Sequence, residues 1–470
     1  MADLLKPDLC IIGRGATGIA LALRARQRGA EVVLIDRGVP EPGDPAHGLI
    51  ARAGLLASAA RAHAIASAGA VGLEAAAPRP SFRSIGEHAA ALAAATTPEH
   101  AAERLTALGV VERRGAPVFT DRNTLSCGET TIKARHFVLA TGARPALPQV
   151  DGLDSVPFFT PDTVLSAVRK FSHLVVIGGE PAALELAQAY RRLGAEVTLV
   201  PQGPLLAGFD PELVALLTTA LTGEGIDIRT GFHAVAVQKR SQGTGVEIAG
   251  PEGNRDTLDV SHILVAHGRA PELNGEWLSK AGLKLHPDHP TQLLLDADGR
   301  TSNRRVTAIG GAAGDTQPTD TVRKGERLLD RLLGGRSTAV PALRHVATEP
   351  ALAEVGVIPA GPKPRPGFTV HRASLAENSA ARALGATQGS AKLVVSARGQ
   401  IVGGGVVGTG AGETVALIAQ TIAHGTPAAG LARLALPEPS AAAVLVTLGR
   451  EIEAASAPPR RGGVLRRLLG

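Results

Sequence analysis

Cysteine is nearly absent from this chain of 470 residues, which contains only Cys10 and Cys127. Two cysteines are too few for a disulfide framework or a four-thiolate zinc site, so we expect neither and assign no metal site. Aromatic residues make up 2% of the chain, which leaves few rings on which nucleic-acid bases stack. Because the net charge is only +6, we expect no nucleic-acid partner.

Long apolar runs are also missing. No uninterrupted run approaches the roughly 20 residues of a membrane-spanning helix. The N-terminus, Met-Ala-Asp, has no positively charged segment before its first apolar run, which favours a strand over a signal peptide. We therefore expect a cytoplasmic protein without membrane association. The basic tail at 457–470 is interpreted as a frayed end or a packing helix, with a membrane-surface anchor as the alternative.

Two segments repeat the pattern strand, glycine turn, helix, strand. Hydrophobic residues make up 44% of the chain, enough for several packed cores, and the length suggests about three domains or sub-domains. Two such units about one domain apart predict two doubly wound folds with parallel sheets. The expected strands and helices are Leu9–Ile12, a helix to Arg28 and Glu31–Ile35 in the first unit, and Leu174–Ile177, Pro181–Leu193 and Glu196–Val200 in the second.

The first unit carries the spacing Gly13-x-Gly15-x-x-Gly18 between its strand and its helix. Glycines in this context allow a tight turn and let the backbone approach a pyrophosphate at the positive end of the helix. Asp36 ends the second strand, where a carboxylate accepts hydrogen bonds from a ribose. These features predict a dinucleotide site. The alternative is a glycine turn that serves only helix–strand packing.

Taken whole, the chain resembles the flavoprotein disulfide reductases, in the style of mercuric reductase and dihydrolipoamide dehydrogenase. The resemblance rests on both nucleotide units, the Ala140-Thr141-Gly142 turn and stretches such as GQIVGGGVVGTGAGE near the C-terminus. It implies an α/β fold with two doubly wound, Rossmann-like nucleotide-binding domains and a C-terminal α+β interface domain through which two chains form a homodimer. The implied domains are a first FAD-binding part at 1–160, an NAD(P)-binding-like domain at 161–270, a second FAD-binding part at 271–338, the interface domain at 339–456 and the basic tail at 457–470.

By this resemblance the first domain binds FAD. The residues that match the family's FAD-binding positions are Gly13, Gly15, Gly18, Asp36, Arg37, Ala140, Thr141, Gly142, Gly310 and Gly311. The family's second FAD motif reads A-x-G-D, and Gly311 stands where its aspartate bonds the ribityl chain. Asp315 lies four residues later, and it substitutes only if the turn is rebuilt.

The redox chemistry of the family depends on a CxxxxC pair, and this chain lacks it. Followed without gaps from Asp36, the two cysteine positions fall on Asp44 and Leu49, and a family lysine falls on Ala53. Only thiolates attack an external disulfide, so we expect no thiol–disulfide relay by the family route. The family's acid/base histidine corresponds to Glu438, and the glutamate that orients it corresponds to Ala443. We therefore assign no catalytic residue.

The second nucleotide unit departs from the glycine pattern at Glu180, which places a carboxylate where the backbone approaches a diphosphate. Val200-Pro201-Gln202 supplies neither an acidic partner for a ribose nor an arginine for a 2′-phosphate. We therefore doubt that NAD(P)H binds there. In the alternative, Glu180 turns outward and NADH binds weakly.

Two functions remain open from the sequence. The first is a divergent FAD-binding oxidoreductase that passes electrons from NAD(P)H or another donor to a small molecule or protein other than a disulfide. The second is a catalytically inactive pseudoenzyme that acts as a homodimeric binding or scaffolding protein. The complete first glycine motif favours the former, and the losses at Glu180 and Gly311 favour the latter.

Overall fold

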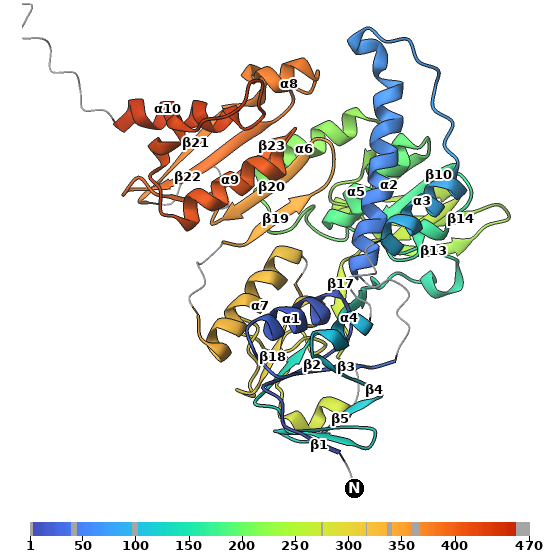
Figure 1. Ribbon diagram of the computed structural model, residues 1–470. Coiled ribbons are helices and arrows are strands. Elements are labelled where there is room, and N and C mark those ends of the chain that lie inside the picture. The colour runs from blue at the N-terminus through green and yellow to red at the C-terminus, as the bar shows by residue number, and fades with distance from the viewer. Residues whose placement is uncertain are drawn as a thin grey trace, which may run out of the picture. The chain divides into compact units, whose positions relative to one another are not determined.

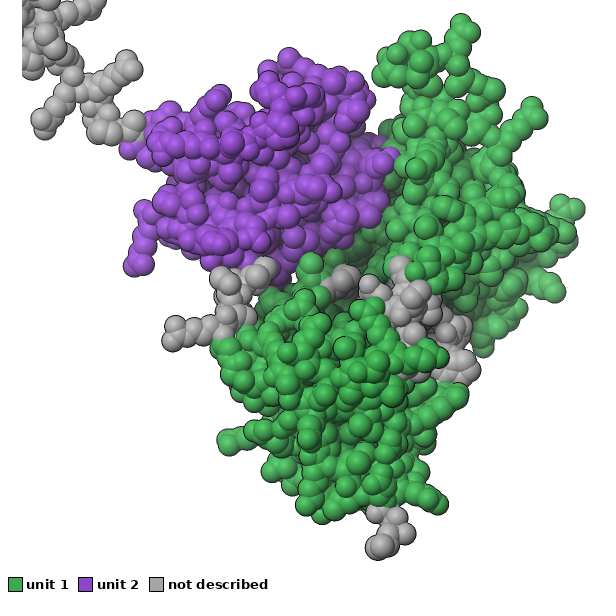
Figure 2. Space-filling model, viewed as in Figure 1, with its two compact units in different colours: residues 1–207, 222–337 green, residues 208–221, 338–470 purple. Residues whose placement is uncertain are grey.

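The computed structural model describes residues 3–38, 45–95, 102–273, 276–315, 317–335, 341–358 and 366–456. It divides into two compact units, Met1–Ala207 with Thr222–Ser337, and Gly208–Leu221 with Thr338–Gly470 (Figure 2). The domain limits expected from the sequence stay predictions. Within the described ranges, no helix combines the length and the apolar character needed to cross a membrane.

The first unit contains a five-stranded parallel sheet in the order β18-β8-β2-β3-β4 (Figure 1). Its central strands are apolar and buried on both faces, as expected for parallel strands covered from both sides. The strands are β2 (Leu9–Ile12), β3 (Val32–Asp36), β4 (Val111–Arg114), β8 (His136–Leu139) and β18 (Val306–Ala308).

Side-chain alternation along β2 divides the core around this sheet into two layers. Leu9 and Ile11 pack with helices α1 (Ala16–Gln27) and α7 (Pro318–Leu333), whereas Cys10 and Ile12 face a second, smaller sheet. Both cysteines are free and buried in that second layer. The smaller sheet has the order β1-β7-β6-β5, from β1 (Asp3–Leu5), β5 (Pro117–Asp121), β6 (Thr124–Cys127) and β7 (Thr130–Ile132).

The same unit holds a second parallel sheet in the order β12-β11-β10-β16. Helix α5 (Pro181–Arg192) connects its two central strands, and a three-stranded antiparallel sheet packs on the same core. The predicted doubly wound folds are therefore confirmed. The parallel strands are β10 (His173–Ile177), β11 (Glu196–Val200), β12 (Asp227–Ile228) and β16 (His262–Val265), and the antiparallel ones are β13 (His233–Lys239), β14 (Thr244–Ala249) and β15 (Arg255–Val260).

Further elements of this unit join the two sheets. Helix α2 (Pro45–Ala66) packs against both α3 (Phe82–Ala95) and α5. The short strands β9 (Ala143–Pro145) and β17 (Arg269–Pro271) pair antiparallel and connect the loops that follow β8 and β16. Helix α4 (Ala102–Ala107) precedes β4.

The second unit is a five-stranded antiparallel sheet in the order β19-β20-β23-β22-β21, covered by helices. It includes most of helix α6 (Pro211–Gly223), although α6 lies between β11 and β12 in the chain. A Cβ at Gly405 of β23 would lie 2.6 Å from Leu213 of α6, so the glycine allows this close packing. The other elements are β19 (Leu343–Val346), β20 (Ala351–Gly356), β21 (Phe368–Ser374), β22 (Ser390–Ser396), β23 (Ile401–Gly408), α8 (Ser379–Ala383), α9 (Ala411–Ala423) and α10 (Ala443–Ser456).

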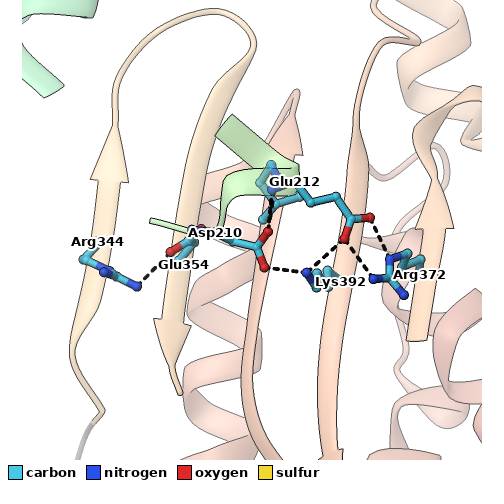
Figure 3. Close-up of polar contacts among 7 residues, drawn as sticks. Asp210, Glu212, Arg344, Glu354, Arg372 and Lys392 are labelled. Carbon is cyan, nitrogen blue, oxygen red and sulfur yellow. Dashed lines mark hydrogen bonds and ion pairs between the residues drawn. The ribbon is translucent and has the colours of Figure 1, made fainter. Parts of the chain in front are cut away.

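A partly buried ion-pair network fixes the start of α6 to this sheet (Figure 3). The Lys392 ammonium lies 2.5 Å from an Asp210 oxygen and 2.9 Å from a Glu212 oxygen, and Arg372 bonds both oxygens of Glu212. Glu354 is fully buried, where it accepts from the Asp210 backbone N–H at 2.7 Å and pairs with Arg344 at 2.9 Å. Buried charges need such partners, because each would otherwise lose its hydration without compensation.

Burial raises the pKa of Glu354 to about 7, from an ordinary value of 4.5. The folded state therefore binds more protons than the unfolded state between these two pH values. The free energy of unfolding should fall as pH rises through this window, by at most about 1.4 kcal/mol per pH unit, and level off above it. Arg372 and Lys392 lower the pKa of neighbouring Glu212 to about 2, so that group titrates outside the window.

Urea unfolding of the second unit, followed between about pH 5 and about pH 8, checks this prediction. Glu354→Gln removes the titrating group, and its curve should be flatter across the window than that of the unmodified chain. Equal slopes for the two proteins would contradict the assignment.

Candidate functional site

The first dinucleotide turn is built by the contact between Gly13 and the loop that follows β8. A Cβ on Gly13, whose φ is +119°, would lie 2.2 Å from the Ala140 carbonyl oxygen. A Cβ on Gly18 would lie 1.9 Å from the Gly13 carbonyl oxygen. Both glycines are therefore required by packing alone, and they place the N-terminus of α1 between the carboxyl ends of β2 and β8. The order of the strands along the chain reverses between β2 and β8, and we call this place the first switch point. In a doubly wound sheet nucleotides bind at such a point.

Gly15 differs from the other two glycines of the motif. Its φ of −72° and ψ of 175° are open to any residue. Among the described residues, apart from its two neighbours in the chain, no atom lies within 4 Å of the position that its Cβ would take. Packing therefore does not explain a glycine at this N-cap. A ligand that approaches the backbone closely does explain it, and the open space lies at the end of the helix that attracts a phosphate.

Asp36 ends β3 as the sequence predicts, and its carboxylate is only partly engaged. One oxygen accepts from the Gly38 backbone N–H at 2.8 Å, and the other is 4.0 Å from the exposed Arg114. That second oxygen is available to a ribose hydroxyl. The Arg37 guanidinium lies 5.5 Å from the centre of the Trp277 ring.

Charged partners that sequence reasoning missed surround this switch point. Arg14, between the first two glycines, pairs with Glu112 of β4 at 2.7 Å. Glu272 lies 2.7 Å from Arg144 and 3.7 Å from Arg37, and its carbonyl oxygen accepts from the Thr141 hydroxyl at 3.2 Å. An arginine inside a glycine motif is the one signal that the sequence offered. The partners of Arg14 and Glu272 lie too far away along the chain to be predicted from the sequence.

The ribityl side of the expected FAD site is rebuilt. A Cβ at Gly311 would lie 2.8 Å from the Ala143 backbone nitrogen, so an aspartate does not fit at this position without backbone movement. Asp315 is buried, accepts from the Gly310 backbone N–H at 2.9 Å and pairs with Lys324. Burial raises the pKa of Asp315. One oxygen of its carboxylate thus bonds the start of the turn Gly310–Ala313, and the other pairs with Lys324.

The region expected for the cysteine pair is described in part. Asp44 lies outside the described residues, and Leu49 and Ala53 are exposed on α2. Arg52, one residue before the family's lysine position, pairs with the buried Glu185 of α5 at 3.1 Å. The cation on α2 is thus present one position earlier than the sequence register predicts. Cys10 and Cys127 lie in the core of the first unit, where burial raises the pKa of both thiols and disfavours the reactive thiolate.

Glu438, at the position of the family's acid/base histidine, is exposed in the second unit and precedes a cis peptide bond to Pro439. The side-chain amide of Asn378 donates to the carbonyl oxygens of Ser440 and Ala441 and fixes the loop. Ala443 starts α10. Among the described residues, no carboxylate or imidazole side chain is paired with Glu438.

Comparison with known proteins decides the family. Residues 7–349 match the pyridine nucleotide-disulphide oxidoreductase model, and residues 343–448 match the dimerisation domain of the same family. The chain belongs to this family. This membership supports FAD as the cofactor.

Relatives and solved structures agree with this assignment. The chain is 30% identical over 447 residues to a mercuric reductase of Streptomyces lividans, covering 91% of this chain and 92% of the relative. It is 31% identical over 451 residues to a dihydrolipoyl dehydrogenase of Thermus scotoductus, covering 92% and 94%. The HOCl-induced flavoprotein disulfide reductase RclA from Escherichia coli has the same fold, with a TM-score of 0.78 at 20% identity, over 94% of this chain and 99% of that one.

The residues present fit one half of the family's cofactor better than the other. Open space at Gly15 and the available oxygen of Asp36 fit the pyrophosphate and adenosine half of FAD. The rebuilt turn at Gly311 offers no carboxylate to the ribityl half. A bound flavin supplies the electron transfer in such proteins, and this chain's own residues supply the position and the electrostatic surroundings.

Gly15→Ala and Gly18→Ala separate ligand binding from packing. Gly15→Ala should change the free energy of unfolding by less than about 1 kcal/mol but weaken the affinity for added FAD roughly tenfold or more, because its methyl group enters the open space. Gly18→Ala should cost about 1–3 kcal/mol of stability, since its Cβ meets a backbone oxygen. Urea unfolding and FAD titration measure both effects. An unchanged FAD affinity for Gly15→Ala would show that this glycine does not face a ligand.

Proposed function

We propose that this chain is an FAD-binding oxidoreductase that has lost thiol–disulfide chemistry. The observation that carries the proposal is Gly15, a glycine that packing does not require at the N-terminus of α1. Family membership supports FAD as the dinucleotide. The remaining cofactor-binding positions named from the sequence, from Gly13 to Gly311, are proposed to line the same site.

The loss of thiol chemistry is supported by the positions of the only two cysteines. Both are buried with raised pKa values, and neither occupies the family's cysteine positions. A flavin transfers electrons without thiols, so the acceptor is proposed to be a small molecule or a protein other than a disulfide. The donor is NAD(P)H or another reductant. The match to the dimerisation domain supports a homodimer, and we propose a cytoplasmic location.

A second candidate, a catalytically inactive homodimeric scaffold, is favoured by the engaged carboxylate of Asp315. Its two oxygens are used by Gly310 and Lys324, which leaves the ribityl side of the site without its family partner. If FAD does not bind, the family fold serves binding or assembly alone. The two candidates differ in one measurable property, the presence of flavin.

The absorption spectrum of the purified chain tests the proposal. A flavoprotein shows the two visible flavin bands, either as purified or after excess FAD is added and the unbound part removed. We expect FAD to be retained but to dissociate readily, because no free carboxylate is available on the ribityl side of the site. A colourless chain that binds no added FAD would favour the inactive scaffold.

A further inference from the structure

The two nucleotide units of this chain share the same turn geometry. Gly178 has a φ of +139°, and its Cβ would lie 2.0 Å from the Ala266 carbonyl oxygen, as that of Gly13 would lie 2.2 Å from the oxygen of Ala140. Gly142 and Gly268 follow in the two facing loops, with φ values of +79° and +78°. The second switch point, at the carboxyl ends of β10 and β16, is therefore built like the first. The two can be compared residue by residue within one chain.

The two units diverge at the N-cap of the helix. Gly15 and Glu180 have nearly the same backbone conformation, with φ and ψ of −72° and 175° for the former and −80° and 163° for the latter. Gly15 faces open space, whereas the Glu180 side chain reaches the facing loop. Its Cγ and Cδ lie 3.6 Å and 3.9 Å from the position of a Cβ on Gly268. Glu180 thus points across the second switch point and not outward.

The N-terminus of α5 has also lost a donor for a phosphate. Pro181 is the first residue of α5 and has no backbone N–H, whereas Ala16 supplies one at the start of α1. The positive end of the helix attracts anions, and Glu180 is the residue at this N-cap, although its side chain makes no capping hydrogen bond. A diphosphate at this end would meet a negative charge as well as one fewer N–H.

The turn that carries Glu180 is held in place from its other side. The Leu206 backbone N–H donates to the Gly179 carbonyl oxygen at 2.8 Å. A Cβ at Gly179 would lie 3.4 Å from Pro201 and 3.5 Å from both Pro204 and Leu205, so the segment after β11 packs directly on the turn. Displacement of Glu180 by a ligand therefore requires its side chain to rotate out of the switch point while the backbone stays fixed.

We propose that Glu180 takes the place of the dinucleotide pyrophosphate in the second unit, so that this unit rejects NADH, NADPH and other nucleotide diphosphates. Glu180 is then the residue that determines the specificity of this switch point. The consequence for electron transfer rests on the proposed function: the flavin is reduced by a donor that does not bind in the second unit.

Binding of NADH to the full chain, measured by isothermal titration calorimetry with FAD present in excess, tests the proposal. We expect no saturable binding to the unmodified chain. Glu180→Gly opens the same space as Gly15 does, and it should increase the NADH affinity at least roughly tenfold. Glu180→Gln keeps the length and removes the charge, so its gain should be smaller and should separate charge repulsion from steric exclusion.

The double variant Glu180→Gly with Pro181→Ala also restores the backbone N–H at position 181. It should bind NADH measurably even if the gain in NADH affinity of the single variant is too small to detect. Circular dichroism checks that each variant folds. Binding of NADH to the unmodified chain with the affinity of Glu180→Gly would overturn the proposal, and so would failure of the double variant to bind. FAD absorbance of the same samples reports the proposed function separately, because it depends on the first switch point and not on Glu180.

Discussion

The structure of both nucleotide units depends on one close contact, between the first glycine of a strand–helix turn and a carbonyl oxygen of the neighbouring loop. A Cβ would lie 2.2 Å from this oxygen at Gly13 and 2.0 Å from it at Gly178, so neither position has room for a side chain. This contact brings the helix N-terminus to the carboxyl ends of the strands, where its unpaired N–H groups and positive end attract a phosphate. What each site can bind then depends on the N-cap residue of the helix, which is Gly15 in the first unit and Glu180 in the second.

The two units differ at this N-cap residue. Gly15 leaves the first switch point open, and Glu180 extends a carboxylate over the second. A carboxylate held by contacts within the chain also occurs at Asp315, which bonds Gly310 and Lys324. Gly13, Gly18 and Gly178, which packing requires, are retained, and so is Gly15, which packing does not require.

The sequence was sufficient for the elements whose signals are local. Strand–turn–helix patterns around Gly13 and Gly178 predicted both parallel sheets, and the absence of a cysteine pair followed from the register after Asp36. Side-chain direction was not predictable, because it depends on residues distant in the chain: Glu180 meets Gly268, and Arg52 supplies a cation to Glu185 where the register offered only Ala53. For the same reason, the packing of α6 on the antiparallel sheet, through Lys392, was missed.

The number of nucleotides bound per chain tests the central claim most directly. Native mass spectrometry of the full chain, offered FAD and NADH together, counts both in one spectrum. The account predicts one FAD and no NADH per chain, since one switch point is open and the other is filled by Glu180. Two nucleotides on each chain, or NADH in place of FAD, would contradict it.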